Sequence, residues 1–513
     1  MGLRLHNTLS KRVEEFVPRE PGHVSMYVCG PTVYDSSHLG HMRAAVVFDV
    51  LRRYLEAGGY RVTHVQNVTD VEDKIIARAQ AEGVPAEQIT SQYGEEYHRA
   101  ALALNILPWH VEPRATQHIP EMIEMIRGLM ERGFAYYAEG DVYFDVTKLP
   151  DYGKLSGRVL EELKVGARVE PGEFKRHPAD FALWKRAKPG EPSWDSPWGK
   201  GRPGWHIECS AMSLKYLGMG FDIHGGGDDL IFPHHENEIA QSEAYAGRGP
   251  FARYWIHNAM FQLSGAKMSK SQRHYVGAAE ALRHYPAEII RYVLISVHYR
   301  KPMEYDSERF EEARRAVDRL RAALVSAATV RSRATGGGAG GTPSAALRAA
   351  ARHGLGAFGA AMDDDLNTSG ALAAIFDLVT AVNRETDAAL KGTAPADALQ
   401  PGLDDAVDAL SRMLGILGLS ITVSREDAGV RDRVQALAAA LRQEAAHLFP
   451  VEPGPSLDEL MAFILEGRQQ ARRLKDFTTA DRIRARLSEA GVLVEDLPTG
   501  PRWRVVGTDG RAS

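Results

Sequence analysis

The sequence predicts an α/β protein in which a parallel-sheet domain is split by an insertion and followed by a helical region and a small C-terminal unit. Strand and helix patterns alternate over the first part of the chain, from VSMYVCG to YRVTHVQNVTD. A passage rich in proline, glycine and tryptophan interrupts this alternation, and beyond about residue 275 the pattern is almost wholly helical. With 513 residues, the chain is long enough for about three or four domains.

The alternation begins with a buried-strand pattern that ends at Cys29. The helical pattern AAVVFDVLRRYLEAGG comes after HLGH, and YRVTHVQNVTD has the pattern of a second strand. Strand, helix and strand in this order predict a βαβ unit with parallel strands and a right-handed connection. Further helix is expected from about 75 to 135, including IPEMIEMIRGLMERG, where Pro120 lies near the helix start.

The sequence pattern changes in the middle of the chain. Short strand-like runs (AYYAEGDVYFDV) and the passage PGEPSWDSPWGKGRPGWH predict an insertion, after which FDIHGGGDDL and YWIHNAMFQL resume the first pattern. A flexible glycine-rich linker, ATGGGAGGTPS, divides the helical region. The expected divisions are 1–120 and 204–258 for the two halves of the parallel-sheet domain, 121–203 for the insertion, 259–333 for a loop and helical region, 334–344 for the linker, 345–450 for a helical bundle and 451–513 for the C-terminal domain.

Composition limits the function classes. The net charge of −5, from 62 basic and 67 acidic residues, gives no overall attraction to nucleic acid, so such a partner needs a local basic surface. No run reaches the roughly 18–20 apolar residues of a membrane span, and MGLRLHNTLSKRVEEF lacks the apolar segment of a secretory signal. Two distant cysteines exclude a disulfide framework and suit a reducing compartment. We therefore expect a cytoplasmic protein with no membrane partner.

A local basic surface is predicted near the C-terminus. Residues 468–486 contain two acidic residues, Asp476 and Asp481, and a larger number of basic ones: Arg468, Arg472, Arg473, Lys475, Arg482, Arg484 and Arg486. Such a run is also typical of a solvated helix face, and the charge pattern alone leaves both interpretations open.

The HLGH motif follows a strand and opens a helix. Unpaired N–H groups and the helix dipole make this position a natural phosphate site. His38 and His41 would lie on its first turn and could donate to a phosphate, although cap or surface histidines can have the same spacing. A second motif, KMSKS, places Lys267 and Lys270 in a loop that could clamp a leaving phosphate; taken alone, it could also be a solvated loop.

Four residues are candidate zinc ligands: Cys29, Cys209, His234 and Glu238. His234 and Glu238 are four residues apart, so they would share one face of a helix. A mixed sulfur, imidazole and carboxylate set is chemically suited to zinc. Considered singly, Cys29 could be a small buried hydrophobe and His234 a core histidine.

The pair HLGH and KMSKS, about 230 residues apart, resembles the signature of class I aminoacyl-tRNA synthetases, with leucine where isoleucine is usual. The set YVCGPTVYDSSHLGH, GRPGWHIECSAM, DIHGGGDDLIFPHHENEIAQSEA and KMSKS closely resembles the cysteinyl-tRNA synthetase family. MDDDLNT and KDFTTADRIRARLSEAGVLVEDLPTGPRWR extend the resemblance over nearly the whole chain. It implies a split Rossmann-type catalytic domain with an inserted connective subdomain, then a helical bundle and an anticodon-binding domain.

The resemblance also implies the activity. L-cysteine and ATP would give cysteinyl-adenylate and pyrophosphate, and the cysteinyl group would pass to the 3′ end of tRNA-Cys in a monomeric enzyme. It implies one zinc ion per chain on Cys29, Cys209, His234 and Glu238, with Mg²⁺ accompanying ATP. The implied catalytic residues are His38, His41, Lys267 and Lys270; ATP would contact His38, His41, Gly226, Gly227, Asp229 and Lys270; and cysteine would contact Thr69, Trp205 and His224. For Trp205, composition alone favours core packing.

A metal explains how cysteine could be chosen over serine. An open zinc position accepts a thiolate, whereas a neutral hydroxyl is a poor ligand for it. Size-based pockets separate such similar substrates by only ~10- to 200-fold, and a bond that the competitor cannot make does better. The sequence departs from the family at Gln272, Arg273 and His274, where Leu-Gly-Asn is usual, and at Asp228, where a small uncharged residue is usual.

Two alternatives share parts of this pattern. A mycothiol-type cysteine ligase resembles the same catalytic half but lacks an anticodon-binding end, and an inactive paralogue could serve as an RNA-binding module. The C-terminal Trp503, flanked by Arg502 and Arg504, forms a plausible base-stacking and phosphate-contacting unit, which favours a tRNA partner. In this context the basic run is predicted to bind RNA.

Overall fold

The computed structural model describes residues 2–160, 174–263, 277–334, 342–421, 425–450, 453–454, 457–497 and 500–505. The chain divides into two compact units. The first contains Met1–Ala313, Gly356–Ala373 and Met413–Leu419, and the second contains Arg314–Leu355, Ala374–Arg412 and Ser420–Ser513. The KMSKS lysines and the three residues that follow the motif lie outside the described residues. The seven sequence divisions stay predictions.

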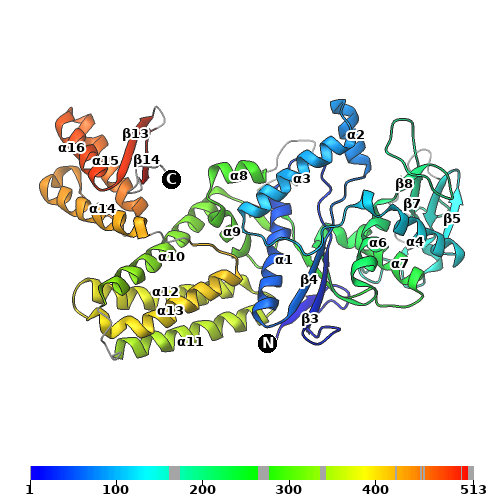
Figure 1. Cartoon of the computed structure of the whole chain (residues 1–513), viewed down its shortest axis with the longest axis horizontal. Coiled ribbons are helices and arrows are strands. Elements are labelled where there is room, and N and C mark those ends of the chain that lie inside the picture. The colour runs from blue at the N-terminus through cyan, green and yellow to red at the C-terminus, as the bar shows by residue number, and fades with distance from the viewer. Residues whose placement is uncertain are drawn as a thin grey trace. The chain divides into compact units, whose positions relative to one another are not determined.

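A four-stranded parallel sheet forms the centre of the first unit (Figure 1). β3 and β4 are neighbours joined through α1, which confirms the predicted βαβ unit. β9 pairs with the other edge of β3, although residues 67–220 lie between β4 and β9 in the sequence. The sheet is therefore assembled from two separate stretches of chain. Its elements are β10 (Ala252–Asn258), β9 (Phe221–Gly227), β3 (His23–Val28) and β4 (Arg61–Gln66), in that order, with α1 at Leu39–Ala57.

Helices cover both faces of this sheet. β3 is buried over five of its six residues, as expected for a parallel strand with both faces covered. α1 lies on one side of β3 and β4, and α6 (Trp205–Leu217) lies on the other (Figure 1). α1 packs so closely that a Cβ added at Gly225 of β9 would lie 2.3 Å from the Phe48 ring. On the opposite face Tyr27 shares a buried cluster with Ile207 of α6.

The insertion forms a four-stranded antiparallel sheet. Two of its strands are the strand-like runs AYYA and DVYF predicted from the sequence. Phe144 and Trp184 of this sheet share one buried cluster with Trp255 of β10, so the insertion packs on the core of the parallel sheet. The strands are β5 (Ala135–Ala138), β6 (Asp141–Phe144), β7 (Phe181–Arg186) and β8 (Gly201–Pro203).

The remaining elements of the first unit are short strands and flanking helices. β1 pairs antiparallel with β2, and β11 pairs parallel with β12. The strands are β1 (Arg4–Asn7), β2 (Arg12–Glu15), β11 (Phe261–Leu263) and β12 (Met303–Tyr305). The helices are α2 (Asp73–Glu82), α3 (Ala86–Ala103), η1 (Ala115–Gln117), α4 (Ile119–Glu131), η2 (Val146–Lys148), η3 (Asp228–Leu230), η4 (Ile231–His235), α7 (Glu236–Ala246), α8 (Ala278–His284) and α9 (Ala287–Ser296).

The N-terminal strand is tied to a segment more than 350 residues away. The backbone N–H of His6 donates to Asp365 Oδ1 over 2.8 Å. The Tyr299 hydroxyl and Arg300 Nε donate to the same carboxylate, each over 2.6 Å. Asp365 belongs to the motif MDDDLNT, so this motif holds two distant parts of the first unit together.

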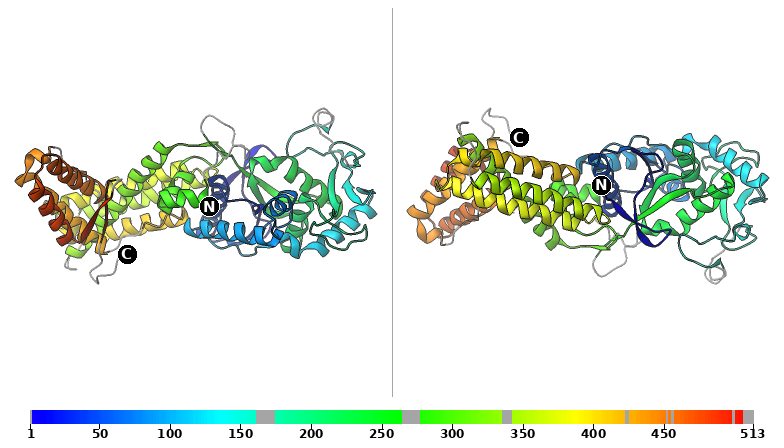
Figure 2. Two further views of the ribbon diagram at one scale, coloured as in Figure 1. Left: turned by 90° about the horizontal axis from the view of Figure 1, so that it is seen from above. Right: turned by 90° about the horizontal axis from the view of Figure 1, so that it is seen from below.

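Four long helices of the second unit lie side by side (Figure 2). Arg319 of α10 stacks over the Phe376 ring of α12, and Arg348 of α11 donates to Asp405 of α13 over 3.0 Å. The helices are α10 (Ser307–Arg333), α11 (Thr342–Asp363), α12 (Thr368–Leu390) and α13 (Ala396–Ile416), whose outer turns belong in part to the first unit.

The C-terminal part of the second unit has its own buried core. Arg468, one of the predicted basic residues, is buried and donates through both terminal nitrogens to Asp496, over 2.7 and 2.8 Å. Trp503 packs partly buried against this core. The elements are α14 (Arg425–Glu444), η6 (Ala446–Leu448), α15 (Leu457–Arg473), α16 (Phe477–Glu489) and an antiparallel pair, β13 (Val492–Leu497) and β14 (Gly500–Val505).

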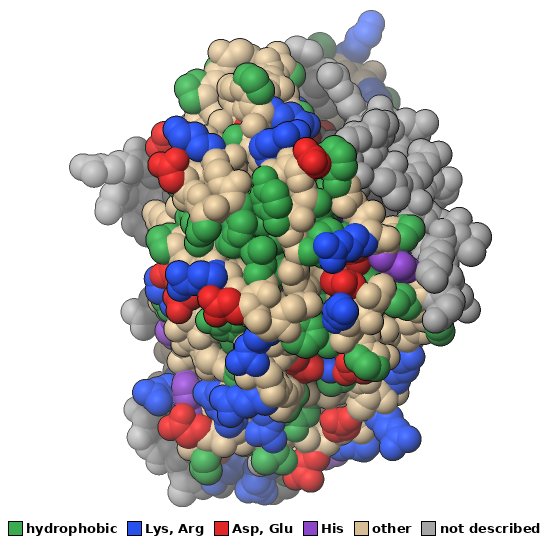
Figure 3. Space-filling model, turned by 90° about the vertical axis from the view of Figure 1, so that its right-hand side faces the viewer, with side chains coloured by type: hydrophobic (Ala, Val, Ile, Leu, Met, Phe, Trp, Pro, Cys, Tyr) green, Lys and Arg blue, Asp and Glu red, His purple; other side chains and the backbone are tan. Residues whose placement is uncertain are grey.

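Two surface properties agree with the composition. On the face shown in Figure 3, basic and acidic side chains are interspersed around a small apolar area. Among the described residues, no helix is long and apolar enough to cross a membrane.

Candidate active site

The predicted site residues gather at the carboxyl ends of the parallel strands, where open α/β sheets bind their ligands. Cys29 directly follows β3, and Thr69 lies three residues beyond β4. His224, Gly226 and Gly227 form the last part of β9. Cys209 lies on α6, His234 on the π-helical turn η4, and Glu238 on the first turn of α7.

Four side chains converge at the base of this site, and we refer to them as the donor set: Cys29, Cys209, His234 and Glu238. Cys29 Sγ lies 3.6 Å from Cys209 Sγ, 3.5 Å from His234 Nε2 and 3.4 Å from Glu238 Oε1. His234 Nε2 lies 3.0 Å from Glu238 Oε1. The fold thus brings together residues from four separate elements.

The donor set fits a tetrahedral metal ion. Ligand distances of about 2.0–2.3 Å place the ligand atoms of tetrahedral zinc roughly 3.3–3.8 Å apart. The three distances from Cys29 fall in this range, and the shorter one between His234 and Glu238 is that of a hydrogen-bonded pair. A second group of described side chains, with His224 and His235 in place of Cys209 and His234, also lies close enough to hold a metal.

Distances and ligand type favour the first group. Within the second group, His235 Nε2 is 4.0 Å from Glu238, and its Nδ1 is 2.8 Å from His257 Nε2. His224 Nε2 is 2.9 Å from Glu238 Oε2, the carboxylate oxygen that does not face Cys29. The donor set, by contrast, includes two sulfurs, and the three distances from Cys29 Sγ to its other members are close to those of a tetrahedral site.

Neighbouring charges within the donor set shift the pKa values of His234 and Glu238 in opposite directions. Burial opposes the charged form of His234, but Glu238 and Cys209 outweigh it and raise the His234 pKa to about 10. Burial opposes the charged form of Glu238 too, but His224 and His234 outweigh it and lower the Glu238 pKa to about 2. Without a metal, the imidazolium and the carboxylate therefore stabilise one another; a metal ion would take the place of the proton on His234.

Outer contacts orient the donors, and two of the residues that make them, His206 and Asn67, are not among the predicted site residues. His206 Nδ1 lies 2.9 Å from His234 Nδ1, which fixes the His234 ring with Nε2 toward the donor set. Asn67 Oδ1 accepts the Gly30 N–H over 3.0 Å, and Asn67 Nδ2 donates to Thr69 Oγ1 over 3.2 Å. A signal existed, because Asn67 lies two residues before Thr69 and His206 follows Trp205.

The backbone at Gly30 lies too close to Asn67 for any side chain. A Cβ at Gly30 would lie 1.6 Å from the Asn67 carbonyl oxygen. This explains in steric terms why a glycine must follow Cys29 at the end of β3. The close approach also brings Asn67 Oδ1 to within 3.7 Å of Cys209 Sγ.

The three residues expected to contact cysteine lie around the donor set. Trp205 is partly exposed and stacks on His234 at 4.3 Å between ring centroids. His224 is fully buried and stacks on Trp255 at 4.4 Å. Thr69 is buried beside Asn67. Since Cys29 and Trp205 are the partly exposed members of this neighbourhood, they mark its accessible side.

The HLGH motif begins α1 as predicted. His38 is the N-cap residue: its Nδ1 accepts the His41 N–H and the His41 Nδ1 accepts the His38 N–H, each over 3.3 Å. The two rings stack with centroids 3.7 Å apart. Burial lowers the pKa of both imidazoles, that of His41 to about 3, so both are neutral near pH 7. With Nδ1 accepting, the proton of each neutral ring is on Nε2, which makes Nε2–H the donor.

The segment that contains KMSKS is bordered on both sides by residues that lie near HLGH. Gly277, the first described residue after the segment, forms an antiparallel bridge with His38, and Ala278 N donates to Ser37 O over 2.7 Å. A Cβ at Gly40 would lie 3.6 Å from Phe261 of β11, which precedes the segment. The described residues on either side of this segment thus lie near the start of α1.

The glycines at the end of β9 pack closely against the residues that follow the strand. A Cβ at Gly226 would lie 2.8 Å from Leu230 and 2.9 Å from the His235 ring. Asp229 is exposed on η3, where its carboxylate can reach a ligand. The adenosine contacts of Gly226, Gly227 and Asp229 stay predictions.

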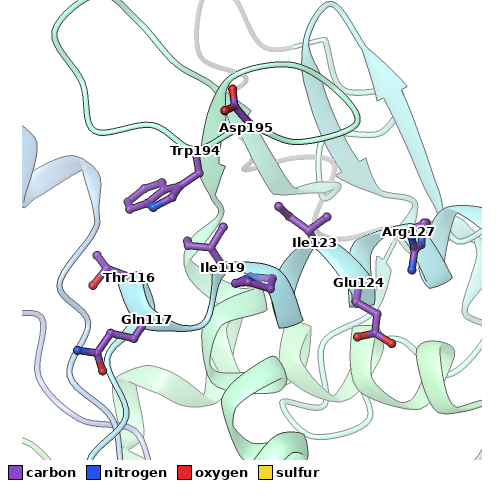
Figure 4. A pocket seen from close by; sticks show the side chains of 9 residues that line it. Thr116, Gln117, Ile119, Ile123, Glu124, Arg127, Trp194 and Asp195 are labelled. Carbon is purple, nitrogen blue, oxygen red and sulfur yellow. The ribbon is translucent and has the colours of Figure 1, made fainter.

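A separate pocket of about 580 Å³ lies between α4 and the loop before β8 (Figure 4). Trp194 covers an apolar wall made by Ile119 and Ile123. None of the described residues that line it is a predicted site residue, but Thr116 on its rim donates from its backbone and hydroxyl groups to Asp70, next to Thr69.

Comparisons with family models agree with this geometry. Residues 15–315 match the model of the class I (C) tRNA synthetase catalytic domain, residues 357–421 match a DALR domain, and residues 454–504 match the anticodon-binding domain of cysteinyl-tRNA ligase. The first match covers more than half of the chain.

Solved structures share the fold at low sequence identity. Methionyl-tRNA synthetase of Mycobacterium tuberculosis, in complex with methionyl-adenylate, aligns with a TM-score of 0.61 and 17% identity over 83% of this chain and 96% of that chain. A ternary complex of LeuRS with tRNA and LeuAMS from Agrobacterium radiobacter K84 aligns with a TM-score of 0.54 and 11% identity, over 79% of this chain and 85% of that chain.

Full-length relatives are much closer in sequence. The cysteine–tRNA ligase of Desulforudis audaxviator is 50% identical over 98% of this chain and 100% of the relative, and that of Desulfitobacterium hafniense is 48% identical over 98% and 99%. With the matched catalytic and anticodon-binding models, this similarity shows that the chain belongs to the cysteine–tRNA ligase family of class I aminoacyl-tRNA synthetases, the enzymes that join cysteine to tRNA-Cys.

Proposed function

We propose that the donor set holds one zinc ion per chain and that this ion selects the substrate of the enzyme by its thiol. The observation that carries the proposal is the convergence of two sulfurs, one imidazole nitrogen and one carboxylate oxygen within 4.8 Å of one another. When bound, zinc supplies an open position that a thiolate takes readily and a neutral hydroxyl takes poorly.

The residues around the donor set orient the substrate. Cys29 and Trp205 lie on the accessible side, so L-cysteine enters along the indole ring, which covers His234. His224 holds the second carboxylate oxygen of Glu238 and keeps the first one directed at the donor set. Thr69 completes this pocket beside Asn67.

ATP binds at the start of α1. The Nε2–H groups of His38 and His41 donate to its phosphates as neutral imidazoles, and the helix N-terminus adds its dipole. Lys267 and Lys270 supply positive charge as pyrophosphate leaves, and Mg²⁺ accompanies the nucleotide. Gly226 and Gly227 admit the adenosine, with Asp229 as the acceptor for its ribose hydroxyls.

The C-terminal part of the second unit binds tRNA-Cys. The match of residues 454–504 to an anticodon-binding model supports this role. Arg468 is used internally by Asp496, so the exposed members of the basic run, such as Arg473, carry the phosphate contacts. The enzyme acts as a monomer in the cytoplasm. Size-exclusion chromatography at several protein concentrations tests the oligomeric state.

The deciding experiment is cysteine transfer by the purified protein with ATP, Mg²⁺, labelled cysteine and total tRNA, next to a serine control. We expect charging with cysteine and not with serine. AMP formation without charged tRNA would favour the mycothiol-type ligase, and the absence of any activation would favour an inactive paralogue. Equal charging with serine would contradict selection through the thiol.

A further inference from the structure

Arg43, two residues after HLGH, is fully buried and makes an unusual set of contacts. One terminal nitrogen donates to the carbonyls of Ala259 and Met260 over 2.8 and 3.0 Å. The other donates to the carbonyls of His298, Tyr299 and Lys301 over 3.3, 3.5 and 2.6 Å. A single guanidinium on α1 thus holds two chain segments that are about forty residues apart in sequence.

One of these segments leads to the KMSKS region, and the other leads to the strand that pairs with it. Ala259 and Met260 lead directly into β11, and residues 298–301 lead into its partner β12. Four residues after the end of β11 comes Lys267. The segments also bond to each other, since the Ala259 N–H donates to the Tyr299 carbonyl over 2.8 Å. Arg43 therefore holds the base from which the lysine-bearing segment departs.

Asp228, one of the departures from the family pattern, contacts the same segment as Arg43. Its carboxylate accepts a backbone hydrogen bond from Met260. Burial lowers the pKa of Arg43 to about 10, and the charge of Asp228 opposes this effect. One oxygen of Asp228 is buried and has no hydrogen-bond partner among the described residues.

Three motifs with predicted ATP contacts meet at Ala259 and Met260: the HLGH helix through Arg43, the glycine turn through Asp228, and the strand that leads to KMSKS. We propose that Arg43 is a positioning residue for ATP activation, which sets the KMSKS-bearing strand against HLGH, and that Asp228 supports it from the glycine turn. This inference rests on the proposed ATP sites and goes beyond them, because neither residue is expected to touch the nucleotide.

Arg291 offers a matched control in the same unit. It is also buried, and it donates to the carbonyls of Leu417 and Leu104 over 2.7 Å each, and to the Asp49 carboxylate. None of these partners borders a predicted ATP contact. Arg291→Lys therefore reports what the loss of a buried guanidinium clamp does to stability alone.

The test compares Arg43→Lys with Arg291→Lys in cysteine-dependent ATP–pyrophosphate exchange and in thermal unfolding. A lysine keeps the charge but cannot span both segments. We expect Arg43→Lys to lower kcat/KM for ATP by about 10- to 100-fold, the size of effect that a misplaced reactive group causes, with KM for cysteine unchanged. Arg291→Lys should lower the midpoint of thermal unfolding and leave the ATP kinetics unchanged.

Equal ATP kinetics in the two folded variants would overturn the proposal. If Arg43→Lys does not fold, Asp228→Asn decides: it should raise KM for ATP, and an unchanged KM would overturn the role of the clamp. If the wild-type protein shows no cysteine-dependent exchange, the proposed function fails instead, and direct calorimetric ATP binding to the same variants then tests the clamp by itself.

Discussion

The donor set draws its four side chains from separate elements spread over residues 29–238, whereas the HLGH turn is complete within four consecutive residues. The two regions also differ in charge. His234 and Glu238 are an ion pair in the absence of metal, while His38 and His41 are neutral. The donor set, formed by residues far apart in the sequence, thus suits a cation. The HLGH turn, formed by neighbouring residues at a helix cap, provides two oriented hydrogen-bond donors.

The largest effect is expected from breaking the donor set. Cys29→Ser replaces the sulfur that lies within 3.6 Å of each of the other three donors by a hydroxyl oxygen, and it should abolish zinc retention. Cysteine activation should fall by about 10⁴-fold, the scale on which a site loses a substrate whose specific bond is gone. Elemental analysis and pyrophosphate exchange measure the two effects. A variant with native circular dichroism, bound zinc and full activity would refute the assignment, and an unfolded variant would make the metal purely structural.

The HLGH turn can be broken without removing its cap. In His41→Asn the amide oxygen can still accept the His38 N–H, but the Nε2–H donor is lost. The exchange rate should fall by about 10²- to 10³-fold, as for other lost transition-state donors, while thermal stability and zinc content stay near the wild type. His41→Gln, which places an amide near Nε2, should recover part of the rate. If both variants are equally impaired, the donor role of Nε2 is wrong.

The outer contacts of the donor set sharpen the comparison further. His206→Phe keeps an aromatic ring but removes the partner of His234 Nδ1. Zinc affinity should fall by about 10- to 100-fold, as is usual for outer-shell partners. His257→Phe is the matched control, because His257 contacts His235 and no member of the donor set. Competition with a chromophoric chelator gives both affinities, and similar losses in the two variants would contradict the specific contact.

The two regions differ in the pH range over which their pKa shifts change the stability of the protein. The His41 pKa is lowered from 6.5 to about 3, so its stabilising contribution is lost as the pH falls below 6.5, by at most about 2 kcal/mol at pH 5. The His234 pKa is raised from 6.5 to about 10, so its contribution is complete below pH 6.5 and is lost as the pH rises toward 10. The Glu238 pKa is lowered from 4.5 to about 2, so its contribution is complete above pH 4.5 and is lost as the pH falls toward 2.

Urea unfolding of metal-free protein at pH 6.5 and pH 5 measures this difference. Wild type should lose more stability between the two pH values than His41→Asn, in which the titrating group is absent. Equal losses would show that His41 is not held neutral by burial. The other buried histidines contribute equally to both proteins and cancel in the comparison.

Sequence patterns predicted what depends on neighbours along the chain. The strand before Cys29, the helix start at HLGH and the strand-like runs of the insertion are all local, and the structure has them. That the four side chains of the donor set lie close together could be expected only from the resemblance to the family. The sequence alone does not show that β3, α6 and α7 meet, because this depends on the order of the strands in the sheet. Asn67 and His206 were missed for the same reason, since their partners are 37 and 28 residues away.

Charge patterns were less informative about the C-terminal region. Arg468 has the spacing of its exposed neighbours, yet it is buried because Asp496 accepts from both of its terminal nitrogens. A count of basic residues cannot reveal this, since the acceptor lies on a strand 28 residues further on. The KMSKS lysines lie outside the described residues, so their predicted role depends on the flanking contacts at His38 and Gly40.

The Asp365 carboxylate has a consequence for how the protein is made. On the ribosome, β1 leaves the exit tunnel long before Asp365 is synthesised, and at about 5–20 residues per second the wait is roughly 20–70 s. During that time the edge near His6 lacks a partner that it has in the native state. The first unit is also incomplete until Met413–Leu419 has emerged, so a truncated chain that ends after residue 421 could still close it, and one that ends before 413 could not.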